Sequence, residues 1–200
     1  MTPDAQQALE TTNRLQTRAC QIIEATRIQT LWETIGHTYL VGSARFGLMT
    51  TPNIDFEVYV EKPDPRDGFS VMREISSLSG ITQIHYLNFL DTEDPGLYWR
   101  IDYRDNKNVL WDFDNWLVPY THPHAGMADA FAKSMIRALN PTTRATIVTL
   151  KAALAQLDSS NKPRGIDIYK AVLRDSVQSV EAFREWQANN PPAPMETWHP

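Results

Sequence analysis

The stretch VGSARFGLMTTPNIDFEVYV, residues 41–60, constrains the fold more than any other part of this 200-residue chain. Successive side chains of a β-strand point to opposite faces of its sheet. Asn53, Asp55 and Glu57 therefore share one face of a strand, and the apolar residues between them share the other. Carboxylates on one face repel each other and are rarely buried without a partner. The pattern predicts a strand with one face in a core and one acidic face that has a specific use.

The composition fits one large domain or two small ones that share a core, with 42% hydrophobic residues. The net charge of -5 argues against a nucleic-acid partner for the molecule as a whole. A single cysteine, Cys20, excludes an internal disulfide and fits a reducing compartment. No apolar run approaches the roughly 18 residues that cross a bilayer, and the N-terminus lacks a signal-peptide pattern. We therefore expect a cytoplasmic protein that does not associate with a membrane.

The first part of the chain mixes helical and strand-like patterns. We expect helices over residues 2–36 and 69–78, and strands over 37–41, 54–61, 81–90, 97–104 and 109–118. Gly42-Ser43 ends the first of these strands as a turn. Because consecutive strands have few helices between them, the sheet is predicted to be mixed or antiparallel rather than doubly wound and parallel.

From His124 onward the pattern is helical, over residues 125–139, 141–157 and 168–186. The chain is therefore predicted to be an α+β protein with an α/β domain over residues 1–123 and a helical domain over 124–190. The remaining residues, 191–200, are rich in proline and are expected to form a flexible tail.

The acidic strand has the features of a metal site. Two carboxylates two residues apart on one strand lie roughly 7 Å apart and can reach one hard cation. Mg²⁺ prefers a few carboxylate oxygens and leaves its other positions to water and substrate phosphates. A third carboxylate for such a site is available in WDFDNW, where Asp112 and Asp114 share a face opposite Phe113.

The Gly-Ser turn before this strand fits the same plan. Glycine permits a close approach of the backbone, and the Ser43 hydroxyl with nearby N–H groups can hold a phosphate.

Residues Gly42 to Val58 resemble the signature of the DNA polymerase β-like nucleotidyltransferase superfamily. That signature is an apolar strand, Gly-Ser or Gly-Gly, a loop, and an acidic-apolar-acidic strand. The resemblance assigns Gly42 and Ser43 to the Gly-Ser element, and Asp55 and Glu57 to the acidic pair.

The resemblance also implies a third carboxylate on a later strand, for which Asp114 is our choice and Asp112 the alternative. Asp55, Glu57 and Asp114 would then be the catalytic residues and the ligands of one or two Mg²⁺ ions. Arg45, just past Gly-Ser, and Lys151, on the second C-terminal helix, are the expected contacts to the triphosphate, together with Gly42 and Ser43.

A second alignment remains open. Asn53-Ile54-Asp55 also fits the acidic pattern, with an amide in place of the first metal ligand. In that register the protein would be a degenerate member that binds nucleotide or a protein partner without catalysis. We favour Asp55-Phe56-Glu57, in which both ligands are charged.

The superfamily implies a nucleoside triphosphate such as ATP, Mg²⁺, and transfer of a nucleoside monophosphate to an acceptor. The acceptor is expected to be a hydroxyl of a small molecule or a protein. Small members with a helical C-terminal half include the antibiotic nucleotidyltransferases, which modify aminoglycosides or lincosamides. The protein is expected to be a monomer or a homodimer.

Overall fold

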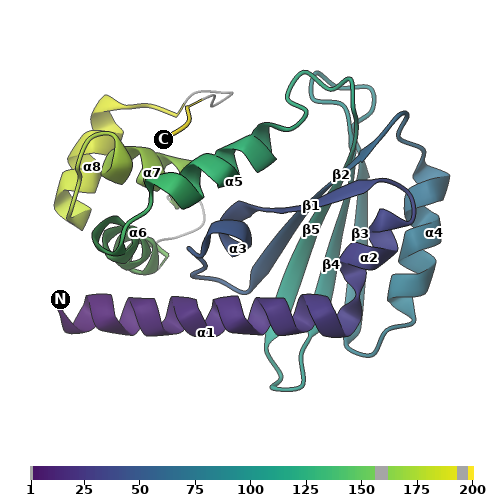
Figure 1. The fold of residues 1–200 in the computed structure, drawn as a ribbon, viewed down its shortest axis with the longest axis horizontal. Coiled ribbons are helices and arrows are strands. Elements are labelled where there is room, and N and C mark those ends of the chain that lie inside the picture. Colours follow the sequence, from purple (N-terminus) through teal and green to yellow (C-terminus); the bar gives the residue numbers. More distant parts are fainter. Residues whose placement is uncertain (1, 156–161, 193–197) are drawn as a thin grey trace.

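The computed structural model describes residues 2–155, 162–192 and 198–200 of the chain. These residues include a five-stranded sheet with the order β1-β2-β5-β4-β3 (Figure 1). The strands are β1 (His37–Val41), β2 (Asn53–Val60), β3 (Ile81–Asn88), β4 (Leu97–Arg104) and β5 (Leu110–Pro119). The neighbours β2 and β5 are parallel and the other three pairs are antiparallel, so the predicted mixed sheet is confirmed.

Eight helices surround this sheet within the described residues. They are α1 (Pro3–Thr26), α2 (Ile28–Glu33), α3 (Gly42–Phe46), α4 (Pro65–Ser76), α5 (Met127–Ala138), α6 (Pro141–Leu154), α7 (Gly165–Leu173) and α8 (Val180–Asn189). The α+β class is thus as predicted. Of the helices in the described ranges, none combines the length and the apolar character needed to cross a membrane.

Two helix predictions and one turn prediction are corrected by the structure. The helix expected up to residue 36 divides at Arg27, whose φ of 55° is left-handed and separates α1 from α2. The helix expected over residues 168–186 is interrupted between Leu173 and Val180, a segment in which Ser176 has a left-handed φ of 57° and Ser179 caps the start of α8. Gly42 and Ser43 do not form a simple turn but begin the short helix α3. Apolar periodicity continues through a single left-handed residue, so it cannot reveal such breaks.

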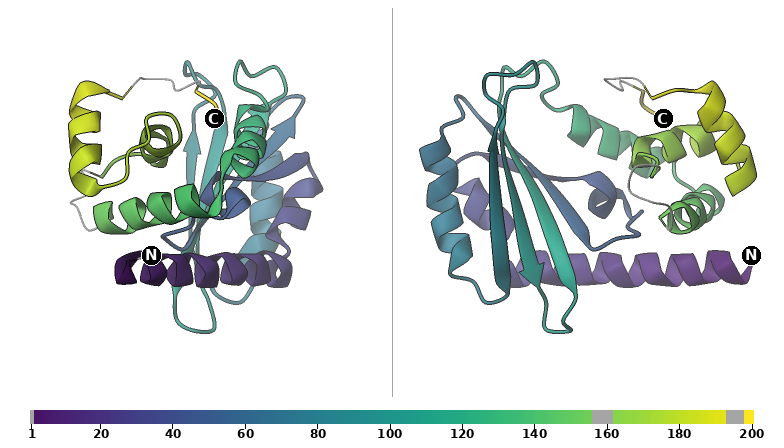
Figure 2. Two further views of the ribbon diagram at one scale, coloured as in Figure 1. Left: turned by 60° about the vertical axis from the view of Figure 1, so that its left-hand side comes forward. Right: turned by 180° about the vertical axis from the view of Figure 1, so that it is seen from behind.

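One face of the sheet is covered by α1, α2 and α4 and carries a hydrophobic core (Figures 1 and 2). The buried strand residues in it are Ile54, Phe56, Val58, Leu97, Trp99, Ile101, Trp111, Phe113 and Leu117. Asn115 lies among them as a satisfied amide, accepting from Trp32 Nε1 at 2.8 Å and donating to the Trp99 and Phe113 carbonyls at 3.1 Å. The apolar members of the β2 pattern therefore lie in the core, as predicted.

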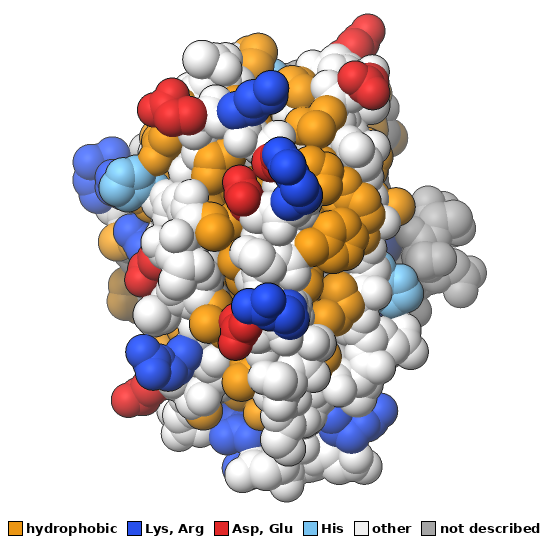
Figure 3. Space-filling view, turned by 90° about the vertical axis from the view of Figure 1, so that its right-hand side faces the viewer, with side chains coloured by type: hydrophobic (Ala, Val, Ile, Leu, Met, Phe, Trp, Pro, Cys, Tyr) orange, Lys and Arg blue, Asp and Glu red, His pale blue; other side chains and the backbone are white. Residues whose placement is uncertain are grey.

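The outer side of this layer is less completely covered. Phe69 of α4 is 47% exposed and packs its ring 4.9 Å from that of Tyr86 on β3. Figure 3 shows this side of the molecule, where charged side chains lie among exposed hydrophobic ones.

A second hydrophobic cluster joins helices α5 to α8 on the other side of the sheet (Figure 2). Phe46 and Leu48, which follow the Gly-Ser element, belong to this cluster, as does Ala8 of α1. Helix α1 therefore contacts both clusters. Of the predicted tail, residues 193–197 lie outside the described residues, whereas the Trp198 ring lies 6.2 Å from that of Phe131.

Candidate active site

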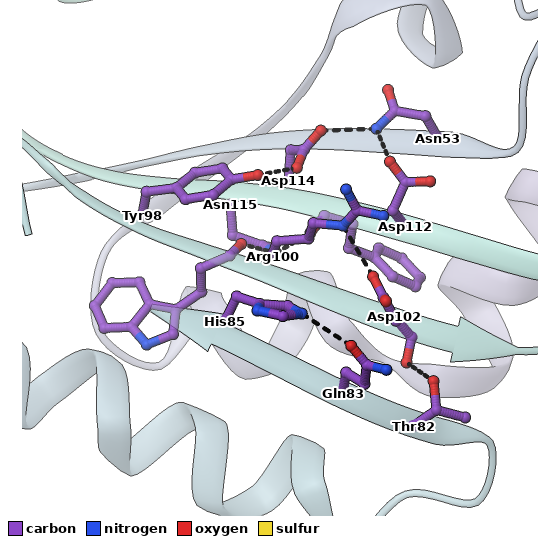
Figure 4. A network of polar contacts seen from close by, with 12 residues as sticks. Asn53, Thr82, Gln83, His85, Tyr98, Arg100, Asp102, Asp112, Asp114 and Asn115 are labelled. Carbon is purple, nitrogen blue, oxygen red and sulfur yellow. Dashed lines mark hydrogen bonds and ion pairs between the residues drawn. The ribbon is translucent and has the colours of Figure 1, made fainter. Parts of the chain in front are cut away.

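The face of the sheet opposite α2 and α4 carries a group of acidic and polar side chains (Figure 4). Parallel pairing aligns Asp55 of β2 with Asp114 of β5, and Asn53 with Asp112. On the other side of β5, Arg100 of β4 pairs with Asp114, and Asp102 with Asp112. Directly paired residues share a face. The two acidic segments singled out in the sequence therefore lie side by side.

Gly42 brings the start of α3 into contact with this face. Its φ of +63° is left-handed, a conformation that glycine adopts without the steric cost of a Cβ. A Cβ built at this position would lie 2.8 Å from the Asp55 Cγ atom and overlap its Oδ2 atom. The Gly-Ser element and the first acidic residue are thus in direct contact, and the contact requires glycine.

Asp55 has an electrostatic environment that resists ionisation. Burial raises the pKa of its carboxyl from 3.8 to about 7, and Asp114, Asp112 and, least, Glu57 add to the effect. The Lys151 ammonium acts in the opposite direction but does not compensate. A group of carboxylates with too little positive charge is chemically suited to a cation.

Asp114 is held by neutral donors from two strands. The Tyr98 hydroxyl donates a short hydrogen bond to its Oδ1 atom, and Asn53 Nδ2 donates to Oδ2 at 2.8 Å. The same Asn53 nitrogen donates to Asp112 Oδ2 at 3.0 Å. Burial, followed by the bond to Asp114, raises the pKa of the Tyr98 hydroxyl, so Tyr98 remains a donor. Asp114, rather than Asp112, is the register partner of Asp55.

Glu57 has a different environment from Asp55. Its register partner is Trp116, and the Tyr59 hydroxyl donates a short hydrogen bond to its carboxylate. Burial raises the pKa of Glu57, while the bond from Tyr59 lowers it. Across the parts of the chain that the structure describes, no three His, Cys, Asp or Glu side chains are grouped so as to hold a metal ion. Asp55, Glu57 and Asp114 thus share a face without converging on one point.

A cavity of about 210 Å³ lies between the Gly-Ser element and the C-terminal helices. Its lining includes Ser43, Asn53, Lys151, Lys162 and Tyr169. Lys151 Nζ donates to the Leu48 carbonyl at 2.6 Å and to the Tyr169 hydroxyl at 3.2 Å. Burial lowers the pKa of Lys151 to about 8, and the nearby Asp55 opposes this change. The predicted residues Ser43 and Lys151 therefore line one basic cavity beside the acidic face.

Arg45 lies elsewhere. It occupies the last turn of α3, and its guanidinium is 3.7 Å from the Asp129 carboxylate of α5. Arg45 does not line the cavity of about 210 Å³ described above, which is called the Ser43–Lys151 cavity from here on. Its predicted contact with a triphosphate stays a prediction.

On the Glu57 side of the face, a second cavity of about 320 Å³ is lined by Glu57, Tyr59, Trp116, His122 and His124, with Asp94, Pro95 and Val118. His122 Nε2 lies 2.9 Å from Asp94 Oδ1. Along β2, Asn53 lines the first cavity and Glu57 the second, with Asp55 between them.

Four residues of this region were not singled out as site residues in the sequence. Tyr98, Tyr169 and Lys162 belong to segments that carry no recognisable motif, and strand pairing or helix packing alone brings them here. The sequence by itself suggests for Asn53 only a ligand position without charge. Its bonds to two carboxylates could not be foreseen, because they depend on the register between β2 and β5.

No family model matches the chain, and no curated protein matches it. The fold, in contrast, is found in solved structures. Cid1, described by its RNA terminal uridylyl transferase activity, aligns over 84% of this chain and 51% of its own with a TM-score of 0.58 and 10% identity. A MgGTP-bound structure of the Cid1 poly(U) polymerase covers 76% of this chain and 47% of its own, with a TM-score of 0.51 and 12% identity.

A third similar structure is the STING-associated CdnE c-di-GMP synthase from Capnocytophaga granulosa. It covers 81% of this chain and 60% of its own, with a TM-score of 0.54 and 12% identity. The chain thus spans about half the length of these structural neighbours. All three are named for the transfer or joining of nucleotides, and at this level of identity the similarity shows that this chain shares their fold.

Proposed function

We propose that the protein is a Mg²⁺-dependent nucleotidyltransferase that moves a nucleoside monophosphate from a nucleoside triphosphate to a hydroxyl group. The observation that carries the proposal is the alignment of Asp55 with Asp114, next to a Gly42 that has no room for a Cβ. The Ser43–Lys151 cavity beside this pair supplies a place for phosphates.

The acidic face is the proposed magnesium site. Its donors are carboxylate oxygens, which Mg²⁺ prefers. Burial, and after it the neighbouring carboxyl groups, raises the pKa of Asp55, and a bound cation would oppose this change. Asp55, Glu57 and Asp114 are the proposed ligands, and their carboxylates would have to converge when the ion binds. When bound, the ion would neutralise charge on the triphosphate and on the departing pyrophosphate.

The protein's own groups have separate roles in this proposal. Ser43, Lys151 and Lys162 bind the triphosphate, and Lys151 is positioned by its bonds to the Leu48 carbonyl and Tyr169. The acceptor oxygen forms a bond to the α-phosphorus while the bond from that phosphorus to pyrophosphate breaks. Asp114 accepts the proton of the acceptor hydroxyl.

We propose that the acceptor enters through the cavity on the Glu57 side. Along β2, Asp55 lies between this cavity and the Ser43–Lys151 cavity, where the triphosphate is proposed to bind. Its size suits a small molecule or a protein side chain. Aminoglycosides and lincosamides are the first small-molecule acceptors to test. A short RNA should be tested as an alternative acceptor, because one structural neighbour is described by its RNA terminal uridylyl transferase activity.

A thermal-shift series with ATP, GTP, CTP and UTP, each with and without Mg²⁺, tests the nucleotide site. We expect a metal-dependent stabilisation of wild type that is lost in Asp55→Asn/Glu57→Gln. The control Asp91→Asn removes an exposed carboxylate between β3 and β4 and should respond as wild type does. A flat response of wild type to every nucleotide would refute the proposal.

A further inference from the structure

We propose that Asn53 is a positioning residue that bridges Asp112 and Asp114 and fixes their orientation, rather than a metal-ligand position that has lost its charge. The inference rests on the proposed function, in which Asp114 is a metal ligand and accepts the proton of the acceptor hydroxyl. It decides between the two registers that the sequence leaves open.

The hydrogen bonds of Asn53 leave its amide nitrogen fully used. An amide nitrogen has two hydrogens, and those of Asn53 go to Asp112 Oδ2 at 3.0 Å and Asp114 Oδ2 at 2.8 Å (Figure 4). One neutral group thus bridges two carboxylates that would otherwise repel each other. An aspartate here would have no hydrogen to donate when ionised, and it would add a third negative charge at hydrogen-bond distance.

Tyr98 completes the arrangement from the opposite side of β5. Its hydroxyl donates to Asp114 Oδ1 while Asn53 donates to Asp114 Oδ2, so each oxygen of that carboxylate has one donor. Each carboxylate oxygen has two acceptor positions, and one on each remains available. Asp114 is therefore fixed in orientation and still able to bind a cation or accept a proton.

The backbone register agrees with this role. Asn53 pairs with Asp112, whereas the two acidic residues that pair with each other are Asp55 and Asp114, two residues farther along β2 and β5. Gly42 approaches Asp55. The acidic pair thus begins at Asp55, and Asn53 stands just before it as a neutral support.

The experiment compares Asn53→Ala, Asn53→Asp and Tyr98→Phe with wild type. Matched controls are Asn189→Ala and Asn189→Asp, on the exposed end of α8, and Tyr103→Phe, whose ring packs on Phe113 on the covered face. Three quantities are measured: the ligand-free melting temperature, the Mg²⁺ concentration for half-maximal stabilisation in an equimolar mixture of ATP, GTP, CTP and UTP, and pyrophosphate release from that mixture with the candidate acceptors.

Positioning residues around metal ligands typically contribute about tenfold or more in metal affinity or activity. We expect Asn53→Ala and Tyr98→Phe each to need about tenfold more Mg²⁺, and Asn53→Asp to release pyrophosphate more slowly than wild type. The three controls should match wild type. Pyrophosphate release by Asn53→Asp that equals or exceeds that of wild type would overturn the inference, as would an unchanged Mg²⁺ requirement in Asn53→Ala.

Failure of the proposed function has a separate signature, which is a wild type that responds to no nucleotide with Mg²⁺. The role of Asn53 is then decided by the ligand-free melting temperature at pH 8. A bridge between carboxylates predicts that Asn53→Asp melts below both wild type and Asn189→Asp. Equal melting temperatures would overturn it.

Discussion

The two faces of the sheet are made by the same strands and differ in almost every physical respect. On the covered face, Phe56, Trp99 and Phe113 have no exposed surface and form the core under α1, α2 and α4. On the opposite face, called the open face here, their sequence neighbours Asp55 and Asp114 are partly exposed carboxyl groups. Because side chains alternate along a strand, the same alternating pattern places apolar residues in the core on one face and the acidic residues of the candidate site on the other.

The polar groups of the two faces show the difference most clearly. Asn115 on the covered face is neutral, and protein atoms satisfy both its amide hydrogens and its oxygen. On the open face, Asp55 lies near two further carboxyl groups, Asp114 and Asp112, and Lys151 only partly offsets their effect on its pKa. Natural cores avoid such unsatisfied charge. This excess of carboxyl groups supports the proposed cation site.

The largest effect on stability should come from the covered face. Phe56→Ala leaves a cavity beneath β2, and truncations of this kind cost about 3–5 kcal/mol. Urea denaturation should show this loss, while the variant still responds to Mg²⁺ and nucleotide below its melting temperature. Loss of the response without loss of stability would break the division between the two faces.

The next effect concerns the open face. Asp55→Asn should reduce pyrophosphate release by about 10²–10³-fold, the range found when one preorganised electrostatic group is removed from an active site. Its stability at pH 8 should equal or exceed that of wild type, because a carboxylate is removed from among others. Normal turnover in this variant would refute the proposed function, and a large loss of stability would mean that Asp55 has a structural role.

The pH dependence of stability sharpens the same comparison. The pKa of Asp55 rises from 3.8 to about 7 on folding, so between these values the folded protein holds a proton that the unfolded chain has released. Stability from this group is therefore lost as the pH rises from about 4 to 7, by about 1.4 kcal/mol for each unit of the shift. The free energy of unfolding of wild type relative to Asp55→Asn, measured by urea denaturation across this range, should fall accordingly. A constant difference would contradict it.

The covered face was predictable from the sequence because it depends on alternation alone. The strand-like runs around Phe56, Trp99 and Phe113 are where they were expected, with boundaries shifted by a few residues at most. The helix breaks at Arg27 and near Ser176 were not predictable, because each depends on a left-handed residue that is not glycine.

The open face was predictable only in part. The sequence supplied Gly42, Asp55 and Asp114, because each belongs to a short motif. It could not supply the bonds from Asn53 and Tyr98, which depend on how three strands align. For Glu57 a signal was present, since Tyr59 follows two residues later on the same face and donates to it.

The smallest expected effects come from substituting two glycines. Comparing Gly42→Ala with Gly126→Ala distinguishes the cost of backbone strain from a disturbance of the candidate site. Gly42 and Gly126 both have positive φ, and an L side chain there costs about 1–2 kcal/mol. A Cβ at Gly126 would meet nothing within 4 Å, whereas one at Gly42 would displace the Asp55 carboxylate. Gly126→Ala should therefore lose stability alone, and Gly42→Ala should lose stability together with the response to Mg²⁺ and nucleotide. Thermal shift of the two variants in parallel measures both quantities. If Gly42→Ala kept the full response, the contact between the Gly-Ser element and Asp55 would have no functional role, and the open face would owe its chemistry to the carboxylates alone.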